Sequence, residues 1–240
     1  MTLSQTSGIL KRNMRIAILL LSSFLCTKNS STAQVAPDAG LWTTATLEYG
    51  LNSKFCLFIT QEMRLKENLS RLNLFYTNLG LEYKIVKNLK TSLSYRQIHK
   101  FTPENYFSFR HRIQWDIGLK KSAGNFELSY RHRLQAEVRN VHSSEIGHLP
   151  EWYSRNKFQI KYSRNNKVEP YISVELRYQL FNPRNPESDY IWHRVRYQGG
   201  IDYKINSHHT MGFYYLMQDE FNIIDPQKMY IIGIEYTLKL

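Results

Sequence analysis

Two copies of an Arg-His-Arg triplet stand out in this chain as residues whose types and spacing could do chemistry. They are Arg110-His111-Arg112 and Arg131-His132-Arg133. Guanidinium groups at alternate positions can bind phosphate, a carboxylate or an acidic sugar through charge-assisted hydrogen bonds. The same spacing also suits an electrostatic ladder, in which each arginine has an acidic partner and no solute takes part. We favour the ladder because Asp and Glu are interleaved with the arginines, and the anion site stays open as the second interpretation.

Charged residues recur at every second position in many other segments. Alternate side chains of a β-strand share one face, so these charges would lie together, opposite the apolar residues. A surface that binds nucleic acid is instead a basic patch or stripe, and we expect no nucleic-acid partner despite the formal net charge of +12. The expected charge cluster comprises Arg96, Arg110, Arg112, Asp116, Glu127, Arg131, Arg133, Glu137, Glu175, Arg177, Arg194, Arg196 and Asp202.

The polar segment 140–151 holds residue types that a hydrolase site needs. It contains His142, Ser143 and Glu145, but such residues are also ordinary loop composition, and we assign no catalytic residue. The histidines lack the paired spacing of a metal site, and no Gly-rich phosphate loop occurs. We therefore expect no metal and no cofactor.

The elements that must position these residues are β-strands. Segment 107–119 has apolar residues on one face and arginines on the other, and segment 126–138 repeats the pattern. A helix would scatter both sets around its circumference. The two segments would form an antiparallel hairpin across a turn at 121–124. If residue 120 lies opposite residue 125, Arg112 faces Arg133, a like-charge pair that needs acids or an anion nearby.

The same alternation gives eleven candidate strands in all. The others are 41–51, 55–65, 71–86, 89–99, 152–163, 168–181, 190–204, 209–218 and 228–240. A closed antiparallel barrel in one bacterial chain is expected to have an even number of strands, so we predict about 10–12 strands, with ten or twelve in the closed form. Within 71–86 the phase slips near Thr77, which fits a β-bulge.

The connections between these strands alternate in length, which is typical of outer-membrane barrels. Short turns fall near 87–88, 121–124, 164–167 and 205–208, and longer polar loops near 100–105, 140–151, 182–189 and 219–227. The last segment, 230–240, is amphipathic to its end and resembles the terminal signal of outer-membrane proteins, although Leu240 replaces the usual aromatic residue. We expect the barrel-assembly machinery to recognise this strand.

The first 33 residues have the features of a secretory signal peptide. Basic residues precede an apolar run from 16 to 26, and Ser31-Thr32-Ala33 fits a cleavage site before Gln34. We predict a signal peptide at 1–33, with Met14 as a possible true start, and a barrel at 34–240. The alternatives are an uncleaved anchor and a lipoprotein signal at Cys26.

Four short motifs resemble one known family. They are Gly40-Leu41-Trp42, Glu62-Met63-Arg64, Ser94-Tyr95-Arg96 and Arg110-His111-Arg112. Together they resemble the family called domain of unknown function 2490 over residues 40–240. Proteins of this family are described as outer-membrane barrels without an assigned activity, so the resemblance implies a fold and a location but no site residues.

The sequence thus predicts an all-β, closed antiparallel transmembrane barrel of the bacterial outer membrane. We expect a porin-like, non-enzymatic protein that is either structural or a narrow anion-preferring conduit with an Arg-rich lumen. Its expected surroundings are outer-membrane lipid and lipopolysaccharide. The alternatives are an outer-membrane enzyme that modifies lipid or lipopolysaccharide, and a soluble periplasmic β-barrel that binds a ligand.

Overall fold

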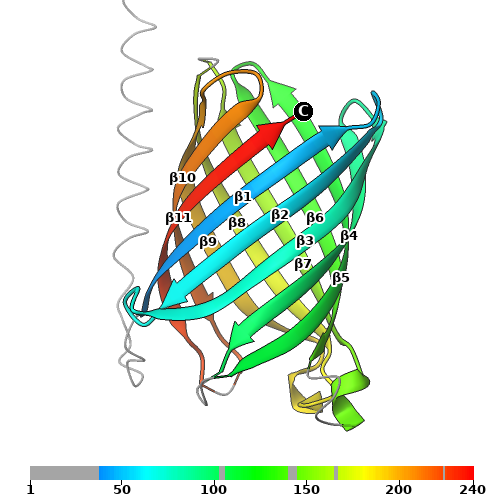
Figure 1. Ribbon diagram of the computed structural model, residues 1–240, viewed down its shortest axis with the longest axis vertical. Coiled ribbons are helices and arrows are strands. Elements are labelled where there is room, and N and C mark those ends of the chain that lie inside the picture. The colour runs from blue at the N-terminus through cyan, green and yellow to red at the C-terminus, as the bar shows by residue number, and fades with distance from the viewer. Residues whose placement is uncertain (1–37, 103–105, 140–144, 165–166, 224) are drawn as a thin grey trace, which may run out of the picture. The chain divides into compact units, whose positions relative to one another are not determined.

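The part of the chain that the structure describes forms a ring of eleven β-strands (Figure 1). The computed structural model describes residues 38–102, 106–139, 145–164, 167–223 and 225–240. The predicted signal peptide lies outside them. No helix within these ranges is long and apolar enough to cross a membrane. The strands are β1 (Asp38–Gly50), β2 (Phe55–Lys66), β3 (Arg71–Val86), β4 (Leu89–Phe101), β5 (Phe107–Ala123), β6 (Phe126–Arg139), β7 (Glu151–Tyr162), β8 (Val168–Phe181), β9 (Ile191–Lys204), β10 (His209–Glu220) and β11 (Lys228–Lys239), with short 3-10 turns η1 (Glu145–His148) and η2 (Pro186–Ser188).

The ring closes between the first and the last strand. Strands β1 and β11 pair in parallel from Asp38 opposite Met229 to Glu48 opposite Lys239, and every other neighbouring pair is antiparallel. The count of eleven strands is confirmed, whereas the expectation that closure needs ten or twelve was wrong. In an up-and-down ring of odd number, the end strands run the same way, and a parallel ladder also satisfies their backbone groups.

The two rims of the barrel differ as the loop lengths predict. One, the short-turn rim, carries the connections 51–54, 87–88, 124–125, 163–167 and 205–208. The other, the long-loop rim, carries 67–70, 102–106, 140–150, 182–190 and 221–227. Because the end strands are parallel, β1 begins at the long-loop rim and β11 ends at the short-turn rim, where Gly50 N donates to Leu240 O at 3.0 Å.

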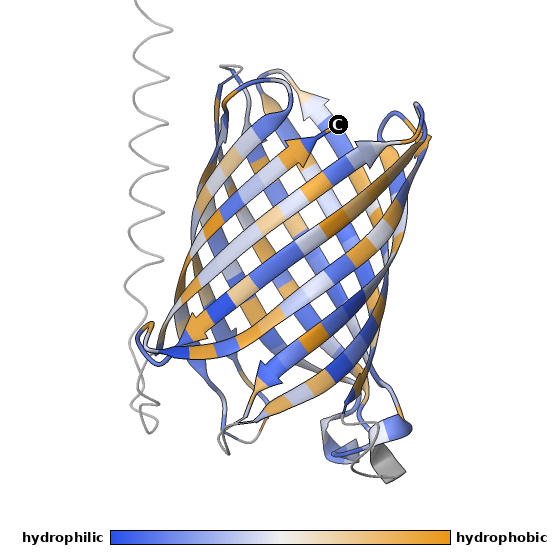
Figure 2. Cartoon of the chain, viewed as in Figure 1, coloured by the Kyte–Doolittle hydropathy of each residue, from blue (hydrophilic) through white to orange (hydrophobic). Residues whose placement is uncertain are grey.

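Hydrophilic and hydrophobic residues alternate along the strands (Figure 2), and the apolar residues of each strand are the exposed ones, as the alternation predicts. Outward-facing Ile172 and Ile113 are 64% and 58% exposed, whereas inward-facing Gln114 and Glu137 are each only 2% exposed. This is the reverse of a soluble protein, in which large apolar side chains are the ones most often buried.

The β5–β6 hairpin has a different register from the predicted one. Its turn is Gly124-Asn125, and Ala123 pairs with Phe126. A turn of two residues needs a positive φ, which Gly124 supplies at 60°. Both strands therefore extend further than the pattern suggested, and Arg112 lies opposite Glu137 while Arg133 lies opposite Asp116. The expected pairing of Arg112 with Arg133 was wrong, and the hairpin joins opposite charges instead.

The phase slip in β3 lies at Asn73 rather than near Thr77. Leu74 pairs with Arg64 and Leu72 with Leu65, so Asn73 is the extra residue of a bulge. From Leu74 to Lys84 the register with β4 is continuous. The misplacement has a simple cause: Leu72 and Leu74 are both apolar but lie on opposite sides of the wall.

Two interior tyrosines lie over glycines of the neighbouring strand. A Cβ atom at Gly200 would lie 2.8 Å from Tyr171 Cζ, and a Cβ atom at Gly233 would overlap the ring of Tyr214. Glycine at these positions leaves the space that each ring occupies against the neighbouring strand.

We predict that Gly233→Ala destabilises the barrel by about 1–3 kcal/mol, because the added methyl group displaces the Tyr214 ring. Gly199→Ala is the matched control, since a Cβ there has no atom within 4 Å. Urea unfolding of the detergent-folded proteins, followed by tryptophan fluorescence, measures both. Equal midpoints for the two variants would contradict the packing described here.

Candidate functional site: a charged interior chamber

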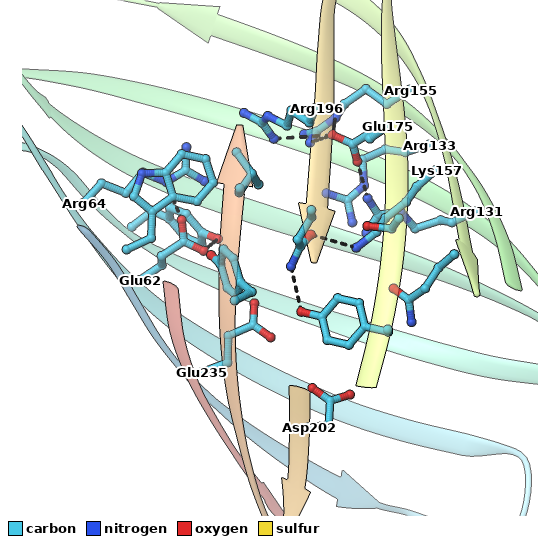
Figure 3. A pocket seen from close by; sticks show the side chains of 18 of the residues that line it. Glu62, Arg64, Arg131, Arg133, Arg155, Lys157, Glu175, Arg196, Asp202 and Glu235 are labelled. Atoms are coloured by element: carbon cyan, nitrogen blue, oxygen red, sulfur yellow. Dashed lines mark hydrogen bonds and ion pairs between the residues drawn. The ribbon is translucent and has the colours of Figure 1, made fainter. Parts of the chain in front are cut away.

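All thirteen residues of the predicted charge cluster occupy inward-facing positions, but they form several groups rather than one. Six of them line a central cavity of about 280 Å³, which we call the chamber (Figure 3). The six are Arg96, Arg131, Arg133, Glu175, Arg196 and Asp202. Arg110 and Arg112 both pair with Glu137 near the long-loop rim. Arg194 pairs with Glu220, also towards that rim. Asp116 binds Arg133. Glu127 pairs with Lys120 near the short-turn rim. Arg177 lies over the ring of Tyr153.

The chamber wall carries more positive than negative side chains. Its seven cations are Arg64, Arg96, Arg131, Arg133, Arg155, Lys157 and Arg196, and its four acids are Glu62, Glu175, Asp202 and Glu235. The excess is three positive charges. A second interior cavity of about 380 Å³ shares Arg131 and Lys157 with the chamber and reaches Glu48, Glu82 and Lys90 near the short-turn rim.

Glu175 is the acid on which most of the chamber arginines converge. It accepts hydrogen bonds from Arg131 Nη2 at 2.6 Å and from Arg155 Nε at 3.1 Å. Arg196 Nη1 lies 3.3 Å from the same carboxylate. A single carboxylate cannot neutralise three guanidinium groups, so the β6, β7 and β9 arginines around Glu175 keep a net positive charge inside the barrel. Because the dielectric constant of such an interior is low, that charge interacts more strongly with an anion than it would in water.

Aromatic faces hold two further chamber arginines. Arg64 Cζ lies 3.6 Å from the centre of the Trp42 ring and also pairs with Glu62. Arg96 Cζ lies 3.8 Å from the centre of the Tyr76 ring. Within the described ranges Arg96 forms no ion pair with an acid. Stacking on a ring face is a favourable cation–π arrangement, and it fixes these guanidinium groups without cancelling their charge.

The chamber lysine is tethered by a neutral side chain. Lys157 Nζ donates to Gln198 Oε1 at 3.3 Å, and Gln198 Nε2 donates to Tyr171 Oη at 2.8 Å. Among the residues that the structure describes, Lys157 forms no ion pair. An ammonium group has three donors, so two N–H groups of Lys157 remain for a solute.

Towards the long-loop rim, paired charges fill the interior. Glu137 binds Arg110, Arg112 and Arg139, and Glu151 binds Arg139 and Arg184. Glu137 and Glu151 are only 2% and 1% exposed. Arg184 belongs to the connection 182–190, so its 2.7 Å contact with Glu151 ties that loop to the interior. Paired charges therefore occupy the interior at this end of the barrel.

Sequence reasoning left five charged chamber residues out of the cluster. They are Glu62, Arg64, Arg155, Lys157 and Glu235. Each occupies the inward phase of its strand, so the alternation itself could have found them. The hydrolase residue types at 142–144 lie outside the described residues. Within the described ranges, no three His, Cys, Asp or Glu side chains come together in a way that could hold a metal ion.

Comparisons with known proteins agree with this architecture. The model of the family "Protein of unknown function (DUF2490)" matches residues 39–229. No curated protein matches the chain in sequence. Among solved structures, the NanC porin is 12% identical with a TM-score of 0.50, and the match covers 85% of this chain and all of the porin. LpxR from Salmonella typhimurium is 10% identical with a TM-score of 0.50, over 81% of this chain and 87% of that one. At these identities the likeness establishes the fold alone, a barrel of the outer-membrane kind.

We predict that Glu175→Gln destabilises the barrel by about 3–5 kcal/mol, because it leaves three enclosed guanidinium groups without their shared acid. Glu127→Gln removes an acid from a pair in which Lys120 is half exposed, and it should cost about 0–1 kcal/mol. Urea unfolding in detergent compares the two variants. A loss for Glu175→Gln no larger than that of the control would show that Glu175 is not the centre of the network.

Proposed function

The chain belongs to the DUF2490 family of proteins of unknown function, and we propose that it is a bacterial outer-membrane protein whose interior is a narrow conduit for small anionic solutes. The observation that carries the proposal is the chamber, with three positive charges in excess and a lysine without an acidic partner among the described residues. Rings of Arg and Lys favour anions in channels.

The outer wall supports the membrane location. Large apolar side chains are exposed over the whole circumference, from Leu47 on β1 to Ile232 on β11. Soluble proteins rarely expose apolar patches of that extent, which speaks against a soluble periplasmic barrel. The same wall supports outer-membrane lipid and lipopolysaccharide as its surroundings, and the amphipathic β11 supports recognition by the barrel-assembly machinery.

Aromatic residues near both rims support the same location. Exposed Tyr49, Phe55, Phe126 and Tyr203 lie towards the short-turn rim, and exposed Phe107, Trp152, Tyr190 and Trp192 lie towards the long-loop rim. Tyr and Trp favour the boundary between hydrocarbon and water, where such girdles flank the apolar band of a membrane barrel.

The ion-pair network at the long-loop rim supports a narrow passage. Glu137 and Glu151 with their arginines occupy the interior there, so a solute that crosses must pass between paired charges. We therefore expect a small conductance rather than that of an open porin.

We predict that the wild-type protein in a planar bilayer gives a small, anion-selective current, measured as the reversal potential across a KCl gradient. Lys157→Glu should shift the reversal potential towards cation selectivity, because it places a negative charge in the chamber. Lys54→Glu makes the same charge change in an exposed turn and should leave the selectivity unchanged.

Two results would overturn the conduit. One is the absence of any current from correctly folded protein. The other is hydrolysis of envelope lipid by the purified protein that His142→Ala or Ser143→Ala abolishes, which would favour the enzyme alternative instead.

A further inference from the structure

One acid of the chamber is left without a partner. Glu62 is bound by Arg64, Glu175 by three arginines, and Asp202 by Lys161 at 2.5 Å. Glu235 of β11 forms no hydrogen bond or ion pair with any residue that the structure describes, although it lines the chamber. A carboxylate enclosed in a barrel is costly unless a positive group compensates it. The groups around Glu235 therefore indicate which ligand would supply the compensating positive charge.

Glu235 lies beside a second carboxylate. The two acids flank Gly212, where a Cβ atom would lie 3.2 Å from Asp202 Oδ1 and 3.5 Å from Glu235 Oε2. Because Gly212 has no side chain, the space between the two carboxylates stays open. Tyr171 and Tyr214 line the same chamber, and their ring faces attract cations. Two carboxylates and two tyrosine rings suit an ammonium group, and we call them the acidic pole.

Two basic side chains, Lys157 and Arg131, lie across the chamber from Glu235 (Figure 3). Two N–H groups of Lys157 remain unused after its hydrogen bond to Gln198. Arg131 lines the same cavity, and its side chain is 33% exposed although its Nη2 atom binds Glu175. Lys157 and Arg131 come from the adjacent strands β7 and β6 and lie directly opposite each other in register. They form the basic pole, which suits a carboxylate.

Tyr171 and Gln198 join the two poles. Gln198 accepts from Lys157 and donates to Tyr171 Oη, which leaves the Tyr171 hydroxyl hydrogen free to donate. The chamber therefore presents a carboxylate-binding side, a neutral hydroxyl donor and an ammonium-binding side. Neither a simple anion nor a simple cation satisfies both poles.

We propose that the chamber binds a small zwitterion of the amino-acid class. Its carboxylate lies against Lys157 and Arg131, and its ammonium group lies against Glu235. A volume of about 280 Å³ equals that of roughly nine water molecules in the liquid, which admits a small amino acid. This inference goes beyond the proposed function, because the bound solute carries no net charge and its site does not depend on anion conduction.

The test is equilibrium binding to the full-length, detergent-folded protein, measured by calorimetry with glycine, acetate and methylammonium as separate probes. Wild-type protein should bind glycine about tenfold more tightly than acetate, since one further charged hydrogen bond is worth that much. Methylammonium should bind most weakly, because the basic pole repels it. Glycine that binds no better than acetate, or no binding by any probe, would overturn the proposal.

Two variants locate the poles. Glu235→Gln should lower the affinity for glycine to that for acetate and leave the affinity for acetate unchanged. Lys157→Gln should lower the affinity for both probes. Glu235→Asp should keep the preference for glycine over acetate. Glu127→Gln lies outside the chamber and should change the affinity for neither probe. An unchanged preference in Glu235→Gln would overturn the assignment of the acidic pole. The wild-type comparison decides the solute class even where a variant does not fold.

The binding experiment and the bilayer experiment test separate claims. Glycine binding without any bilayer current would reject the conduit and keep the site. An anion-selective current in a protein that does not distinguish glycine from acetate would reject the site and keep the conduit.

Discussion

The structure depends on one constraint, which is that every backbone N–H and C=O group in the wall needs a partner within the wall. In hydrocarbon an unsatisfied group costs several kcal/mol, so the sheet must have no edge. Eleven strands meet this demand because β1 and β11 pair in parallel over eleven residue pairs. The common direction of β1 and β11 and the placement of the chain's two described ends on opposite rims both accompany that closing pair.

Closure also creates the interior in which the charges must be accommodated. Near the long-loop rim, Glu137 and Glu151 each bind at least two arginines. In the chamber the pairing is incomplete: Glu175 serves three arginines, Lys157 relies on Gln198, and Glu235 has no partner among the described residues. An interior that was only structural would gain by completing these pairs. Incomplete pairing next to an open cavity is instead what a site for a charged solute requires.

Register decided how the charges combine. The Arg-His-Arg triplets favoured a ladder over an anion site, and the β5–β6 hairpin does pair Arg112 with Glu137 and Arg133 with Asp116. The turn that sets this pairing is Gly124-Asn125. The turn lies at Gly124 because a two-residue turn needs a positive φ. The alternating pattern does not reveal this position, because the pattern is the same wherever the strand ends. For that reason the pattern gave the correct faces and the wrong partners.

By itself, the sequence located the strand segments, the alternation of the rims and the face on which each charge lies, because these depend only on local periodicity and turn composition. Arg96, Arg131 and Glu175 could be assigned to the interior in this way. The tertiary structure alone decided that eleven strands close, that Glu62 and Arg64 join the same chamber, and that Lys157 and Glu235 face one cavity without partners. These facts depend on which strands are neighbours around the ring, and no pattern within a single strand carries that information.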